Sequence, residues 1–148
     1  YEMNFLLSKL TVETVMTKKV ITIDGDTPVE DAARIMVDND IGGLPVMKGN
    51  TLVGIITESD IFKMFLELFG TREKGLRVTL MISEEKGSLA RLTAAIFEHG
   101  GNIVSTGTFL GEDLTNAMVV MKIIDLDRET IVRILTPLSE KIVDIRET

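Results

Sequence analysis

The stretch "LVGIITESDIF", residues 52–62, joins an apolar segment to four consecutive polar residues and then resumes apolar character. Residues 52–56 are typical of a β-strand. From Ile61 onward the apolar positions follow helical spacing. Because hydroxyl and acidic side chains favour the start of a helix, Thr57 and Asp60 mark a strand-to-helix junction. The stretch leaves open whether these polar groups cap the helix or hold a ligand.

The residues around this junction predict one small α/β unit. Asp24-Gly25-Asp26 and Lys48-Gly49-Asn50 are turn signals. Thr27 is expected to cap a helix that has Pro28 at its first position. The expected elements are a strand at 20–23, a helix with its apolar spacing at 29–36, strands at 43–47 and 51–57, and a helix at 61–69 with a wide apolar surface.

A second unit follows a polar linker that we place at 70–75, between two glycines. The strand "LRVTLMIS" alternates strictly, which predicts that one face is buried and the other exposed. Gly87-Ser88 opens a helix, and His99-Gly100-Gly101 stops it. Strands are expected at 102–110, 116–124 and 141–145, with a helix at 127–139. This βαββαβ order resembles a ferredoxin-like sandwich, so we expect an α+β protein.

Length, charge and cysteine content exclude several classes of protein. The 148 residues suit one average domain or two small ones. A net charge of −7 argues against non-specific nucleic-acid binding and against anionic membrane surfaces. The chain has no cysteine, which excludes disulfides and thiolate zinc sites and is compatible with the cytoplasm, where we expect the protein. No apolar run approaches the ~20 residues of a membrane-spanning helix.

The chemistry-bearing residues outside the junction have simple structural interpretations. His99, the single histidine, lies at a helix C-terminus, where the helix dipole favours a cation. Glu84 and Glu85 are expected to line a solvated turn, and Asp24 and Asp26 lack the remaining ligands of a calcium loop. No nucleophile–base pair stands out. We therefore expect no catalytic residue, no metal site and no tightly bound cofactor.

The first unit resembles a CBS domain over residues 10–69. The resemblance lies in "VMTKKVITIDGDTPVEDAARIM" (15–36) and "IGGLPVMKGNTLVGIITESDI" (41–61). It implies a site for an adenine nucleotide, such as AMP or ATP, or for S-adenosylmethionine. In such a site Thr57 contacts phosphate and Asp60 contacts ribose. The full set implied is Lys19, Ile21, Ile41, Gly42, Gly43, Pro45, Thr57, Ser59 and Asp60.

Elementary chemistry is compatible with this site and also with a simpler role for the junction. Backbone N–H groups and the helix dipole favour phosphate at a helix start. A carboxylate at Asp60 suits the two hydroxyls of a ribose. Alternatively, Thr57 is an N-cap and Asp60 a first-turn acid that contributes about 0.3–1 kcal/mol. Both interpretations remain open at this point.

The second unit resembles an ACT domain over residues 76–148, on the segment "SEEKGSLARLTAAIFEHGGNI" (83–103). Many ACT domains carry Asp and then Pro-Gly at this turn, whereas this chain has Glu84 at the acidic position and Lys86 in place of the proline. The resemblance implies a second small effector, usually an amino acid. The implied effector residues are Glu84, Glu85, Lys86, Gly87, Ser88, Leu89, Asn102 and Ile103.

A CBS unit followed by an ACT unit is similar to the acetoin-utilisation protein B type, in which two CBS repeats precede the ACT domain. Residues 1–9 are then the tail of a preceding repeat. We expect a regulatory sensor without catalysis, and a homodimer through helix 61–69, through the ACT sheets, or through both. Burial of helix 61–69 against the chain's own second unit is the alternative. The rival functions are an assembly module without a small ligand and the regulatory fragment of a larger enzyme.

Overall fold

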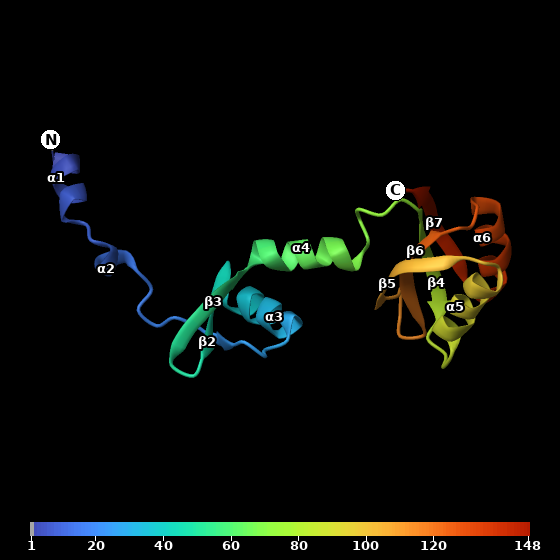
Figure 1. Ribbon diagram of the computed structural model, residues 1–148, viewed down its shortest axis with the longest axis horizontal. Coiled ribbons are helices and arrows are strands. Elements are labelled where there is room, and N and C mark those ends of the chain that lie inside the picture. Colours follow the sequence, from blue (N-terminus) through green and yellow to red (C-terminus); the bar gives the residue numbers. More distant parts are fainter. Residues whose placement is uncertain (1) are drawn as a thin grey trace. The chain divides into compact units, whose positions relative to one another are not determined.

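The computed structural model describes residues 2–148, without the side chains of Glu2, Asn4 and Leu6. Tyr1, assigned above to the tail of a preceding repeat, lies outside the described residues. The α+β class is confirmed by two separate sheets accompanied by helices (Figure 1). Contacts divide the chain into two compact units, one ending at Ile61 and the other running from Phe62 to Thr148. This division falls inside helix α4 (Glu58–Leu68), so the linker predicted at 70–75 lies in the second unit.

The first unit contains a three-stranded sheet in the order β1-β2-β3. Strands β1 and β2 are parallel, and β2 and β3 are antiparallel. Its buried hydrophobic cluster consists of Ala32, Met36 and Leu44. The elements are α1 (Glu2–Lys9), α2 (Val12–Val15), β1 (Ile23–Asp24), α3 (Val29–Asn39), β2 (Gly43–Lys48), β3 (Thr51–Thr57) and the start of α4.

Two local predictions in the first unit were wrong. The strand predicted at 20–23 is reduced to Ile23–Asp24, because parallel pairing with β2 involves only these two residues. Helix α3 is capped by Pro28, whose carbonyl accepts from Ala32 N–H at 3.0 Å. Thr27 instead belongs to the preceding turn, where its N–H donates to the Asp24 carbonyl at 3.1 Å.

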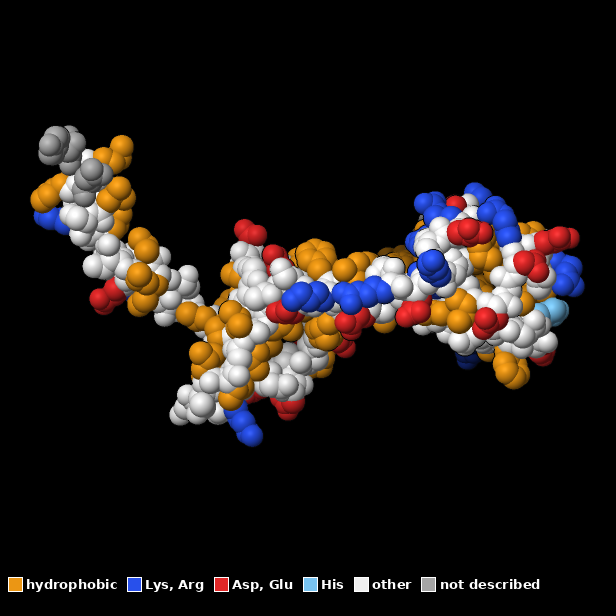
Figure 2. Space-filling model, turned by 45° about the horizontal axis from the view of Figure 1, so that its top comes forward, with side chains coloured by type: hydrophobic (Ala, Val, Ile, Leu, Met, Phe, Trp, Pro, Cys, Tyr) orange, Lys and Arg blue, Asp and Glu red, His pale blue; other side chains and the backbone are white. Residues whose placement is uncertain are grey.

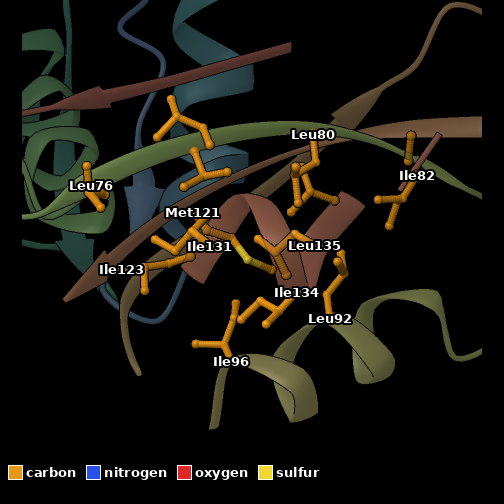
Figure 3. Close-up of a cluster of buried hydrophobic side chains, with 14 residues drawn as sticks. Leu76, Leu80, Ile82, Leu92, Ile96, Met121, Ile123, Ile131, Ile134 and Leu135 are labelled. Carbon is orange, nitrogen blue, oxygen red and sulfur yellow. The ribbon is translucent and has the colours of Figure 1, made fainter. Parts of the chain in front are cut away.

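The second unit contains a four-stranded sheet in the order β5-β6-β4-β7, with antiparallel neighbours throughout. In Figure 3 side chains of the two helices, including Leu92 and Ile131, converge on strand residues such as Leu80 and Met121. This cluster is the larger of the two cores. The elements are β4 (Leu76–Ser83), α5 (Ser88–Glu98), β5 (Asn102–Leu110), β6 (Asn116–Ile124), α6 (Arg128–Leu135), the short 3₁₀ helix η1 (Thr136–Leu138) and β7 (Lys141–Glu147).

Strand β4 is more buried than its alternation predicts. Leu80 and Ile82 lie in the core, as the pattern indicates. On the opposite face, however, Thr79 and Met81 are also buried. Strand β4 pairs with β6 along one edge and with β7 along the other, so on each face its side chains are flanked by side chains of both neighbouring strands. A residue pattern within one strand does not reveal this central position.

Leu92→Ala is expected to lower the free energy of unfolding of the second unit by about 2–5 kcal/mol, because it leaves a cavity in a packed core. Leu92 is 0% exposed. The measurement is urea denaturation followed by circular dichroism. Leu114→Ala is the matched control, since Leu114 is 92% exposed, and it should change stability by no more than about 0.5 kcal/mol. Equal effects of the two substitutions would contradict the assigned core.

Candidate functional site

Thr57 and Asp60 form a reciprocal hydrogen-bonded cap at the start of α4. The backbone N–H and the hydroxyl of Thr57 donate to Asp60 Oδ2 at 3.0 and 2.7 Å. The backbone N–H of Asp60 lies 3.4 Å from Thr57 Oγ1. This arrangement is a capping box, with aspartate in the place that glutamate usually occupies. The simpler interpretation of the junction is therefore realised in the structure.

Two glycines of the predicted site lie directly beside this cap. The Gly42 carbonyl accepts from Glu58 N–H at 3.1 Å, and Gly43 pairs with Thr57 across the β2–β3 ladder. A Cβ atom on Gly43 would stand 3.4 Å from the Ile56 carbonyl oxygen, closer than most side chains approach backbone. The structure thus brings Gly42, Gly43, Thr57 and Asp60 together where β3 passes into α4.

The other predicted nucleotide residues are more dispersed. Ile41 packs against the small buried cluster. Pro45 lines an apolar cleft of about 460 Å³ together with residues 52–55 of β3. Ser59 is exposed, and Lys19 and Ile21 are exposed in a segment outside the strands. Neither this cleft nor a second one in the first unit, which includes Asp24 and Asn50, is lined by Thr57 or Asp60.

A second candidate site is a cleft of about 380 Å³ between the end of β4 and the start of α5. Five of the predicted effector residues line it: Glu84, Glu85, Gly87, Ser88 and Leu89. Lys86 is exposed and does not line the cleft. Asn102 and Ile103 lie on the first residues of β5, paired with Ile124 and Ile123 at the end of β6, and do not line the cleft either.

Five lining residues of this cleft were not predicted. Ile82, Ser83 and Ala90 adjoin the predicted segment in the sequence, whereas Thr108 and Ala117 are distant from it. These last two belong to β5 and β6 and reach the cleft through the sheet register, in which Ala117 pairs with Ile82 of β4. The only available signal was the expected strand order, because no motif contains these residues.

The second site carries negative charge at its rim. Glu84 also lines an adjoining cleft of about 360 Å³, which Asp113 lines as well. The Thr115 hydroxyl and N–H donate to Asp113 Oδ1, and these hydrogen bonds hold the pKa of Asp113 below its ordinary value. Arg91 provides local positive charge, 3.9 Å from the Glu85 carboxylate and hydrogen-bonded to Ser88 Oγ. The clefts therefore combine fixed carboxylates with the positive end of α5.

His99 takes the structural position that the sequence indicates. Its Nδ1 lies 2.8 Å from the Ala95 carbonyl, one turn earlier in α5. Within residues 2–148, the structure shows no cluster of three or more metal-ligating side chains. Among the same residues, no helix combines the length and apolar character needed to span a bilayer.

Comparison with known proteins identifies the first unit. Residues 12–67 match the family model of the CBS domain, so this segment is a CBS domain, as its residues predicted. The chain is 36% identical over 101 residues, 62% of its length, to an uncharacterised protein of Methanocaldococcus jannaschii, of which the match covers 23%.

Matches to two named enzymes are shorter. The chain is 37% identical over 84 residues to a homoserine O-acetyltransferase of Methanosalsum zhilinae, covering 56% of this chain and 17% of that protein. It is 45% identical over 49 residues to an inosine-5'-monophosphate dehydrogenase of Thermoplasma acidophilum, covering 33% and 10%. The chain thus spans less than a quarter of the length of these three relatives.

Thr57→Ala is expected to destabilise the first unit by about 1 kcal/mol, because it removes a helix cap. Thr57→Ser keeps the hydroxyl and is expected to retain most of the stability. The measurement is chemical denaturation monitored by helical circular dichroism. If alanine and serine variants unfold at the same denaturant concentration, the hydroxyl does not cap α4.

Proposed function

We propose that this chain is a non-catalytic regulatory protein whose CBS domain binds an adenine nucleotide, AMP or ATP, or S-adenosylmethionine, at the β3–α4 junction. CBS domains commonly bind adenine nucleotides. The observation that carries the proposal is the capped start of α4. There Thr57 and Asp60 lie beside Gly42 and Gly43, at the start of β2.

The chemistry of the junction suits a phosphate and a sugar. The first turn of α4 presents backbone N–H groups and the positive end of the helix dipole. Gly42 and Gly43 carry no side chain, so a planar ring could approach the backbone once the Glu58 carboxylate moves away from Gly42, where it lies 3.4 Å from the position of an added Cβ atom. An ionised carboxylate has about four acceptor positions. Asp60 can therefore accept from ribose hydroxyls while it still accepts from the backbone N–H of Thr57.

A bound phosphate would compete with the existing cap. The Thr57 hydroxyl has one proton, and in this structure Asp60 Oδ2 accepts it at 2.7 Å. A phosphate oxygen that accepts a hydrogen bond from this hydroxyl replaces Asp60 Oδ2 as the acceptor, so the hydroxyl must rotate and the cap must rearrange. Ligand binding is thereby linked to the conformation at the start of α4, which is a basis for regulation.

The relatives support a regulatory role. Segments similar to this chain occur in two enzymes whose names state different reactions, an acetyl transfer and a dehydrogenation. A segment that covers 17% and 10% of such enzymes is more readily explained as an attached module than as the catalytic part. The same coverage supports the alternative in which this chain is the regulatory part of a larger enzyme.

We further propose that the second unit is an ACT-like domain that binds an amino acid or mediates dimerisation. Its βαββαβ element order and its all-antiparallel sheet support a ferredoxin-like arrangement. In the β4–α5 cleft, the carboxylate of Glu84 would attract an ammonium group. The first turn of α5 would attract a carboxylate. A CBS unit followed by such a domain supports kinship with cytoplasmic acetoin-utilisation-type regulators.

An assembly module is the second candidate, favoured by exposed apolar side chains in the middle of the chain. Figure 2 shows hydrophobic side chains at the surface over this region. Phe62 and Leu68 of α4 and Ile55 of β3 are each more than 60% exposed. Such surface is normally covered by a partner. We propose a second copy of the chain as this partner, giving a homodimer.

Nucleotide binding is tested by thermal melting of the protein with AMP, ADP, ATP, S-adenosylmethionine and a panel of amino acids. A ligand present at ~100 times its dissociation constant should stabilise the protein by about 2.7 kcal/mol. Thr57→Ala with Asp60→Ala should abolish the nucleotide response, because it removes both the hydroxyl and the carboxylate, with the free-state melt measured in parallel. Amino-acid responses should persist in this double variant. Absence of any shift at millimolar nucleotide would count decisively against the sensor.

Dimerisation is tested by Phe62→Glu, which places a charge on the exposed face of α4. We expect the dimer measured by light scattering or sedimentation to become a monomer. Val37→Glu on α3 is the control, because Val37 is 81% exposed and outside this surface. A wild-type protein that is monomeric at all concentrations contradicts the dimer, and a dimer that survives Phe62→Glu contradicts this interface.

A further inference from the structure

Lys122 of β6 is a buried lysine that no proposed function uses. It is 3% exposed. Its Nζ donates at 2.7 Å to the carbonyl oxygens of both Gly70 and Glu73, which lie 52 and 49 residues earlier. These two carbonyls belong to the polar, glycine-bracketed connection that the sequence predicts to be a linker. The buried ammonium of Lys122 thus binds the backbone of a segment whose composition is typical of a flexible linker.

The geometry at the end of α4 explains why a cation is favourable there. Gly70 adopts φ +55°, its N–H donates to Glu67 O at 2.9 Å, and Thr71 N–H donates to Leu66 O at 3.1 Å. This is the Schellman pattern of a glycine-terminated helix. The carbonyls at such an end carry the negative part of the helix dipole. Lys122 donates to the carbonyls of Gly70 and Glu73, which follow the helix, and so places its charge close to this end.

Apolar packing holds the same helix end. The ring of Phe69 lies over Gly107 of β5, where an added Cβ atom would come within 2.9 Å of the ring. Phe69 also stacks with Phe109, with ring centroids 6.0 Å apart. Gly70 lies against Val104, again at a distance of 2.9 Å for an added Cβ. Glycines on both sides of this contact permit the close approach.

We propose that Lys122 is a positioning residue that latches the end of α4 and the connection 69–75 onto the second sheet. The connection is then an ordered part of the second unit that joins α4 to the second sheet. If the connection left the sheet, the Lys122 ammonium would lose its two carbonyl partners. It would then remain on the face of β6 that also carries Val120 and Ile124. As a consequence that rests on the proposed nucleotide site, a rearrangement at the start of α4 is transmitted along a helix whose far end is attached to the second sheet.

The latch is tested by limited trypsin digestion of the full chain, with cleavage after Arg72 and Lys74 followed by mass spectrometry. Both side chains are exposed, so their cleavage depends on local opening of the backbone. Lys122→Met keeps the apolar stem and removes the donor. It should accelerate cleavage at these two sites about tenfold or more, because hydrogen bonds from a charged group are lost.

The latch predicts that Lys122→Met accelerates cleavage only after Arg72 and Lys74. Cleavage after Arg91 and Arg133, in α5 and α6, should stay at the wild-type rate. Lys141→Met, an exposed lysine of the same sheet, should change nothing. Should Lys122→Met fail to fold, Gly107→Ala serves instead, because its methyl group displaces Phe69. A selective rise at Arg72 and Lys74 supports the latch, whereas no rise, or an equal rise at all sites, overturns it.

AMP provides the probe for transmission. In the wild type, AMP at a concentration that raises the melting temperature should change cleavage after Arg72, and in Lys122→Met it should not. A melting shift without any change in cleavage overturns transmission. If AMP gives no melting shift, the proposed nucleotide site fails, while the latch is still decided by the digestion without ligand.

Discussion

Helix α4 is held by its two ends, and much of the rest of the structure follows from this constraint. No residue of α4 is fully buried, and Ile61 is its one side chain that packs against the core cluster of the first unit, so packing of an apolar face contributes little to its stability. The Thr57–Asp60 cap satisfies N–H groups at its start, and the Gly70 turn satisfies the carbonyls of Leu66 and Glu67 at its end. Lys122 holds the residues that follow, through the Gly70 and Glu73 carbonyls. Unsatisfied helix ends are costly. The proposed nucleotide site and the proposed latch therefore lie where the backbone demands partners.

The two units differ in how firmly they are built. The second has fourteen buried residues in one cluster, drawn from its strands and both helices, whereas the first has three. A domain of about 60 residues is marginal even with a full core. Binding of a ligand or of a partner would stabilise such a domain, because either shifts its folding equilibrium by mass action. A thin core and exposed apolar strands are consistent with a module that responds to what binds it.

Sequence reasoning located the parts of the candidate site that depend on local spacing. The i, i+3 relation of Thr57 and Asp60 places both side chains at one helix start in either interpretation. The CBS resemblance implied Gly42 and Gly43, and the structure brings Gly43 opposite Thr57 and joins Gly42 to Glu58. Thr108 and Ala117 were missed because only the strand order of the second sheet carries them to the β4–α5 cleft. The same register places Asn102 and Ile103 on the first residues of β5, outside this cleft.

By itself, the sequence determined the order of the main helices and strands from β1 onward, the glycine that ends α5, and the apolar stripe of β4. These depend on residues a few positions apart, where backbone sterics and periodicity act. Only the tertiary structure decided that Thr79, Met81 and Lys122 are buried, and that the glycine-bracketed connection belongs to the second unit. Burial depends on which strands become neighbours and which segment covers them. Contacts between residues about 50 positions apart, such as those of Lys122, leave no local pattern in the chain.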